Sequence, residues 1–80
     1  MLSNYIEAAM KHAKFEWLDS DRAWYGEIAD LPGVWATGRD EGACRSELRS
    51  VLEGWLLLSI HDHDELPVID GVDLSVRQVA

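Results

Sequence analysis

The stretch ADLPGVWATGRDE, residues 29–41, constrains the fold more than any other part of the sequence. Pro32 removes a backbone donor and Gly33 permits backbone angles that other residues avoid, so the preceding apolar run must stop at this corner. The run VWAT then predicts another strand, which Gly38 ends. Asp40 is a good helix N-cap, and an acidic residue follows it near the positive end of a helix. The stretch therefore predicts strand, corner, strand and helix.

Two extended runs precede this corner. AKFEWLDS begins at Ala13 and AWYGEIAD ends at Asp30, and a polar, turn-like Ser-Asp-Arg joins them. Two aromatic-rich runs with a short polar connection predict a β-hairpin. In the second run Trp24 and Tyr25 point to opposite faces, so the pattern does not say which face is core. A sheet covered on both sides, by a helix and by a second subunit, would produce this pattern.

Helical periodicity is found on both sides of these strands. At the N-terminus, apolar residues at spacings of three and four predict a first helix from about Asn4 to Lys11, capped by Asn4 or Ser3. After Asp40, a single apolar stripe predicts a long amphipathic helix. The members of this stripe are Cys44, Leu48, Val51, Leu52, Trp55, Leu58 and Ser59. Additional apolar residues near the end of this helix indicate a second packing surface there.

The element order α-β-β-β-α is that of a small α+β domain, and we expect residues 1–80 to form one domain. Asp70-Gly71 predicts a turn. The residues after this turn would form either a short fourth edge strand or a loose tail. A chain of this length buries only about 60 to 65% of its unfolded surface, so association with itself or with a partner would supplement a thin core.

The charge balance limits the classes of partner. There are 15 acidic and 7 basic residues, a formal net charge of -8, and no Lys/Arg cluster. Direct nucleic acid binding is therefore not expected. A basic protein would be attracted, although an acidic surface also serves solubility alone. No apolar run approaches the roughly 20 residues that span a bilayer, and the N-terminus lacks signal-peptide features, so a cytoplasmic protein without a membrane association is expected.

Each group of residues that could carry chemistry has a plainer structural interpretation. HDHDE, residues 61–65, combines histidines with carboxylates, but consecutive residues fit a solvated helix end better than a metal site. Cys44 would lie about 25 Å from these histidines along a helix, so we interpret it as a buried small hydrophobe. Glu16 and Glu27 could face each other across the hairpin, and His12 has no partner nearby in the sequence. We predict no catalytic residue, no metal, no cofactor and no enzymatic activity.

The sequence resembles the HicB antitoxin family over nearly its whole length. The resemblance is carried by the strand before the Leu-Pro-Gly corner, the strand ending in Thr-Gly, and the capped amphipathic helix. The subgroup that it resembles most begins with a Tyr-Ile-Glu-Ala-Ala-Met helix, residues 5–10 here, and has Leu-Pro-x-Ile-Asp-Gly near its end, residues 66–71 here. Ala29 replaces the usual first proline of the corner, Asp40 replaces the usual Thr cap, and Gly42-Ala43 replaces the usual Glu-Glu or Glu-Ala.

The resemblance implies a partial ribonuclease-H-like fold with helices on one face of a three-stranded antiparallel sheet. It also implies a non-enzymatic antitoxin whose partner is a HicA-like toxin, a small basic protein that cleaves mRNA and whose active site the antitoxin covers. The family's C-terminal DNA-binding module is not expected here, so the chain would be a stand-alone N-terminal domain, acting as a homodimer or tetramer. The alternatives are an orphan structural or adaptor domain without a toxin and, more remotely, a metal-dependent hydrolase.

Two sets of residues follow from these expectations. The predicted partner-binding residues are aromatic and acidic side chains of the hairpin and third strand: Trp24, Tyr25, Glu27 and Trp35. The sequence does not say which of them would meet the toxin and which a second copy. The predicted structural residues are those of the corner, the strand end and the helix cap: Pro32, Gly33, Gly38 and Asp40.

Overall fold

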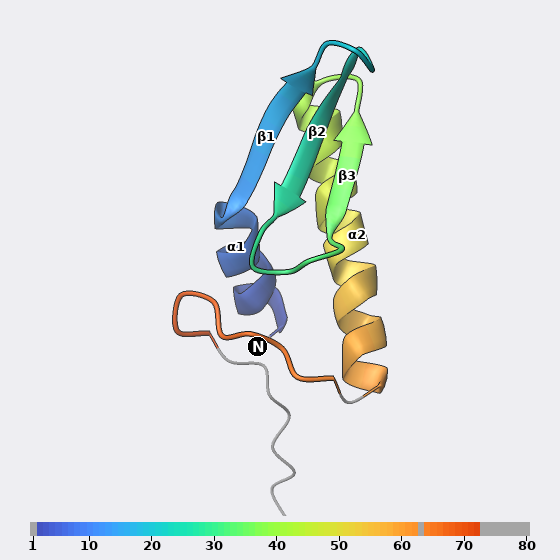
Figure 1. Cartoon of the computed structure of the whole chain (residues 1–80). Coiled ribbons are helices and arrows are strands. Elements are labelled where there is room, and N and C mark those ends of the chain that lie inside the picture. The colour runs from blue at the N-terminus through green and yellow to red at the C-terminus, as the bar shows by residue number, and fades with distance from the viewer. Residues whose placement is uncertain (1, 63, 73–80) are drawn as a thin grey trace, which may run out of the picture.

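The sheet has three strands, and Figure 1 shows the long helix across one of its faces and the short helix near one end. The structure is a computed structural model that describes residues 2–62 and 64–72. The elements are α1 (Leu2–Lys11), β1 (Ala13–Leu18), β2 (Ala23–Ile28), β3 (Trp35–Gly38) and α2 (Glu41–His61). This order confirms the predicted small α+β domain.

The sheet is antiparallel throughout, with strand order β1-β2-β3, so β2 is central and β1 and β3 are edges. Trp17 faces Trp24 across the first ladder, and Glu27 faces Trp35 across the second. Successive side chains of a strand point to opposite faces. The register therefore separates the side chains that face α2 from those on the opposite side.

Two glycines allow α2 to lie close against the sheet. A Cβ added to Gly26 would lie 2.6 Å from the ring of Phe15 and 3.2 Å from the sulfur of Cys44. A Cβ added to Gly38 would lie 2.4 Å from the backbone nitrogen of Cys44. The buried thiol of Cys44 donates a hydrogen bond to the carbonyl oxygen of Ala36 at 3.5 Å, and its burial raises the pKa of the thiol. Cys44 is thus a core residue, as predicted.

The corner and the helix cap form as the sequence predicts. Gly33 has a φ of 96°, in the left-handed region that favours glycine. The N–H of Val34 donates to the carbonyl oxygen of Leu31 at 3.0 Å, which closes the corner. At the start of α2, the side chain of Asp40 accepts a hydrogen bond from the N–H of Ala43 at 2.7 Å. Both features join elements that are adjacent in sequence.

The bounds of two elements differ from the prediction. α1 already includes Leu2, so neither Ser3 nor Asn4 is its cap. The third strand begins at Trp35 rather than one residue earlier, because the N–H of Val34 is used within the corner.

The buried row of α2 turns around the helix along its length. Leu48, Leu52 and Leu56 are fully buried, and each step of four residues advances about 40° around a helix. The row therefore moves from the sheet toward α1, where Tyr5 is also fully buried. The predicted stripe is wrong at Leu58, which is 61% exposed, because the end of α2 packs beside α1 and not on the sheet.

Two arginines cover the flank of α2 that faces α1 and β1. The guanidinium of Arg45 lies 4.7 Å from the ring centroid of Phe15. Arg49 forms an ion pair with Glu7 of α1, with 3.2 Å between nitrogen and oxygen. Both arginines on this flank are therefore engaged by contacts within the chain.

Residues 64–72 return from the end of α2 to α1 (Figure 1). Ile69 and Val72 exchange backbone hydrogen bonds of 3.2 and 2.8 Å around Asp70-Gly71, both of which have positive φ, so the predicted turn is confirmed. Up to Val72 this segment forms only an isolated bridge. The predicted alternatives of a fourth strand or a loose tail concern residues 72–80, of which 73–80 lie outside the described residues. Within the described ranges, no helix is long and apolar enough to cross a membrane.

Candidate functional site

The face of the sheet opposite α2 is turned toward the viewer in Figure 1, and none of the described elements covers it. Tyr25 of β2 and Trp35 of β3 stack on this face, with ring centroids 6.1 Å apart and an interplanar angle of 25°. Trp35 is 53% exposed. We call this surface the open face; its central side chains are those of Lys14, Glu16, Tyr25, Glu27, Trp35 and Thr37.

The strand register sets the charges of the open face. Glu16 lies opposite Tyr25, and Glu27 lies opposite Lys14. The expectation that the two glutamates face each other directly is therefore wrong, because the register offsets them by two residues. Removal of the phenol from water raises the pKa of Tyr25, and Glu27 and the charge of Glu16 raise it further. At neutral pH the aromatic stack is therefore uncharged, with two carboxylates nearby.

Shallow hollows flank the aromatic stack. One of about 350 Å³ lies on the β1 side, where Glu16 and Glu27 contribute to its lining. Another of about 300 Å³ lies beside the corner, between Tyr25 and Pro32. Aromatic groups next to depressions that a partner's side chains can fill are the usual setting of binding hot spots. The open face thus combines exposed aromatic groups with shallow hollows on both sides of them.

Trp24 lies apart from the open face. Its side chain is on the α2 side of the sheet, near the hairpin end, where it meets Trp17 edge to face with ring centroids 6.2 Å apart. Of the four residues predicted to bind a partner, the structure brings Tyr25, Glu27 and Trp35 together and separates Trp24 from them.

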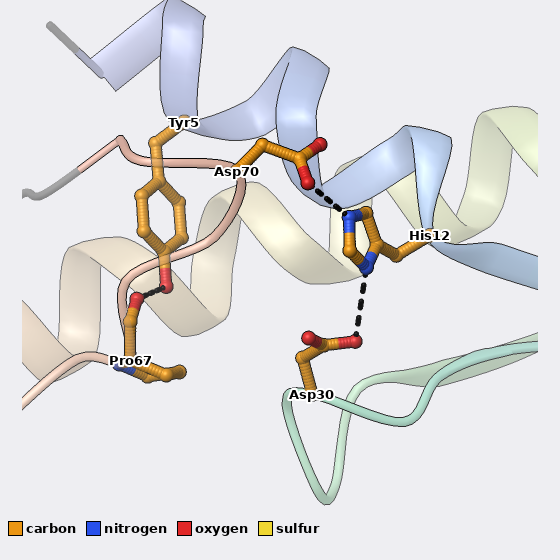
Figure 2. A network of polar contacts seen from close by, with 5 residues as sticks. All are labelled: Tyr5, His12, Asp30, Pro67 and Asp70. Carbon is orange, nitrogen blue, oxygen red and sulfur yellow. Dashed lines mark hydrogen bonds and ion pairs between the residues drawn. The ribbon is translucent and has the colours of Figure 1, made fainter.

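Figure 2 shows a polar network that sequence reasoning missed. His12, just after α1, contacts the carboxylate of Asp70 through Nε2 at 2.8 Å and that of Asp30 through Nδ1 at 3.3 Å. The hydrogen bond with Asp70 raises the pKa of His12 against the opposing effect of desolvation, and the charges of both carboxylates raise it further. Nearby, the hydroxyl of Tyr5 donates to the carbonyl oxygen of Pro67 at 2.6 Å.

This network holds the C-terminal segment against the rest of the domain. Its members come from α1 and the residue after it, the β2–β3 corner and residues 64–72 (Figure 2). Asp70 lies 58 residues after His12, so no local pattern could have revealed the pairing. The contacts explain how a segment without helix or strand is fixed in place.

The HDHDE stretch contributes no metal cluster among the residues that the structure describes. His61 is the last residue of α2 and Asp62 its C-cap, while His63 lies outside the described residues. Within 2–62 and 64–72, no group of three His, Cys, Asp or Glu residues is placed to hold a metal ion. The described part of the stretch is the end of α2 and the residues directly after it.

The fold and its open face define a small α+β domain with a one-sided sheet. The chain belongs to the UPF0150-like family, whose model matches residues 4–67. It is similar to the crystal structure of TTHA0281 from Thermus thermophilus, with 38% sequence identity over 96% of this chain and 95% of that chain and a TM-score of 0.90. No curated protein matches the chain.

Proposed function

We propose that this chain is a non-enzymatic, antitoxin-like binding module that neutralises a HicA-like toxin, a small basic mRNA-cleaving protein, by covering its active site. The observation that carries the proposal is the open face, where Tyr25 and Trp35 stack in contact with solvent beside two carboxylates. Tyr and Trp are enriched where proteins meet. The HicB-like sequence features supply the class of partner.

Charge supports a basic partner. The chain has a formal net charge of -8, and Glu16 and Glu27 lie beside the aromatic stack. Complementary charges speed encounter and fix orientation, whereas buried aromatic anchors provide most of the affinity. We therefore assign affinity to Tyr25 and Trp35 and orientation to the two glutamates.

The test starts with a search for an adjacent reading frame that encodes a small basic protein, whose absence would favour the orphan domain; where it exists, co-expression, co-purification and growth rescue follow. With purified proteins, mRNA cleavage should stop at equimolar antitoxin. Trp35→Ala should weaken binding about tenfold or more, because truncating an aromatic hot spot costs about 2 kcal/mol or more. Trp17→Ala is the matched control, because Trp17 is 46% exposed but lies on the other face of the sheet.

The outcomes separate the alternatives. If the Trp35→Ala and Trp17→Ala variants inhibited mRNA cleavage by the toxin equally well, the toxin would not dock through the open face. If this chain neither bound the neighbouring small basic protein nor restored growth, the interpretation as an orphan structural or adaptor domain would be favoured. Glu27→Lys should slow association and reduce its salt dependence. The remote alternative of a metal-dependent hydrolase requires saturable binding of Zn²⁺, Mn²⁺ or Mg²⁺ in calorimetric titration.

A further inference from the structure

The two layers of the fold end together on one side of the molecule. β3 is an edge strand that pairs with β2 alone among the described residues. α2 runs behind it, and in Figure 1 no described element lies beyond either of them on that side. We call this surface the β3–α2 edge; it consists of β3 and the helix residues Glu47, Val51, Gly54 and Leu58.

The strand at this edge has backbone groups available for pairing. The carbonyl oxygen of Val34 accepts from the N–H of Ile28 on β2 at 3.3 Å. Because hydrogen-bonding direction alternates along an antiparallel strand, Ala36 also faces β2, while Trp35 and Thr37 direct their N–H and C=O groups outward. β3 contains neither Lys nor Pro, the residues that commonly block exposed edges. The strand can therefore accept another strand.

The helix flank beside this strand is apolar beyond Glu47, and of its residues Val51 packs against the core. Leu58 is 61% exposed and Val51 is half-buried. Gly54, on the same side at spacings of three and four, has no atom within 4 Å of an added Cβ. An exposed glycine inside a helix costs about 1 kcal/mol relative to alanine. Packing within the chain does not require this glycine, whereas a second helix packed closely here would.

The opposite flank of the helix provides a contrast. There Arg45 and Arg49 are engaged by Phe15 and Glu7. At the β3–α2 edge, a groove of about 590 Å³ runs between strand and helix, and Glu47 is its sole charged lining residue. A groove with a single charged lining residue therefore lies on the side where both the sheet and the helix layer end.

We propose that a second copy of this chain binds at the β3–α2 edge. Around a two-fold axis at Ala36, the β3 strands of the two copies pair antiparallel. Trp35 of each copy then exchanges both backbone hydrogen bonds with Thr37 of the other, and the two sheets become continuous. Behind them the Val51–Leu58 flanks of the α2 helices meet. The same patch serves both copies, as a two-fold dimer requires.

Charge favours a second copy over a basic partner at this edge. Two chains of net charge -8 repel each other, so they associate best through a surface that carries little charge. α2 is about 30 Å long and each layer is about 10 Å thick, whereas the four residues of β3 span about 13 Å. The edge therefore presents about 430 Å² in projection, about half of the roughly 800 Å² that each partner buries in a standard interface.

Sedimentation equilibrium of the isolated protein tests the proposal, with no toxin present. Leu58→Glu places a charge in the helix contact. Leu57→Glu is the matched control, because Leu57 is 60% exposed but lies about 100° around the helix from both Leu58 and the buried Leu56. Thr37→Pro removes an outward N–H that the ladder to β2 does not use. We expect the wild type and Leu57→Glu to be dimers, and the other two variants to raise the dimer Kd about tenfold or more.

Hydrogen exchange provides an independent readout. The amides of Trp35 and Thr37 should be protected in the wild type and should exchange faster in Leu58→Glu, although the substitution lies on the helix. Far-UV circular dichroism should be unchanged in Leu58→Glu. If Thr37→Pro does not fold, the dimer Kd and the hydrogen exchange of Leu58→Glu test the proposal. A monomeric wild type at about 100 μM, well above the Kd of a specific interface, or equal weakening by Leu57→Glu and Leu58→Glu, would overturn the proposal.

Discussion

The substitution Gly38→Ala tests the close approach of β3 and α2. The new Cβ would lie 2.4 Å from the backbone nitrogen of Cys44 and 2.7 Å from its Cα. These are backbone atoms, so no side-chain rotation relieves the contact. The helix start is held in place by the Asp40 cap, at 2.7 Å. To reach an ordinary contact of 3.4 Å, α2 would have to move about 1 Å from the sheet.

The cost of this movement is large for a small domain. Overpacking costs about 1 to 3 kcal/mol, and a gap of about 0.5 to 1 Å forfeits roughly a quarter to a half of the affected dispersion energy. Since both effects act at the junction of strand and helix, we expect Gly38→Ala to lower the free energy of unfolding by about 3 kcal/mol. In a domain of this size, that lowers the Tm by about 12 to 24 °C.

Urea unfolding followed by circular dichroism measures the effect, at one protein concentration for all variants because self-association adds to apparent stability. Gly42→Ala is the matched control: the nearest atom to its new Cβ is a carboxylate oxygen of Asp40 at 3.4 Å, an ordinary contact. It should gain up to about 1 kcal/mol from helix propensity. If Gly38→Ala unfolds within about 0.5 kcal/mol of the wild type, the argument from close approach is refuted.

Three further predictions concern the cap and the polar network. Asp40→Ala should lower the free energy of unfolding by about 1 kcal/mol in urea, while Asp40→Asn should be nearly neutral. Tyr5→Phe removes the donor to the carbonyl oxygen of Pro67 and should cost about 1 kcal/mol in the same assay. Folding raises the pKa of His12. Its contribution to the free energy of unfolding is therefore complete below the pKa of the unfolded state, about 6.5, and is lost as pH rises through the pKa of the folded state. Stability should therefore fall toward pH 8, and a slope that persists in His12→Gln would contradict this assignment.

The elements were predictable because each depends on neighbours in the sequence. A period near two and a short polar connection produce the hairpin, Pro32 and Gly33 produce the corner, and Asp40 begins α2 through a contact three residues away. Burial along α2 was predicted correctly at Cys44, Leu48, Leu52 and Ser59. Toward the end of α2, α1 is the neighbour, and Leu56 replaces Leu58 as the buried residue. An apolar pattern does not say which neighbour a helix will have.

The candidate site was predictable in composition but not in arrangement. The aromatic and acidic residues of the strands were recognisable, yet their grouping depends on register. Register places Glu16 opposite Tyr25, and it sets Tyr25 diagonally next to Trp35. The pairing of His12 with Asp70 depends on how the last segment returns to α1, across 58 residues of sequence. Such contacts require the tertiary structure.

Trp35 belongs to both proposed surfaces, the open face through its side chain and the β3–α2 edge through its backbone. Its side chain lies on the open face, stacked on Tyr25, while its backbone groups point toward the free edge of β3. In a dimer formed through β3, the aromatic stacks of both copies would lie on the same side of one continuous sheet, so each dimer would offer two toxin sites. Truncating the Trp35 side chain should therefore weaken toxin binding far more than dimerisation, whereas Leu58→Glu should do the reverse. A variant at either position that weakened both to the same extent would mean that the two surfaces are not separate.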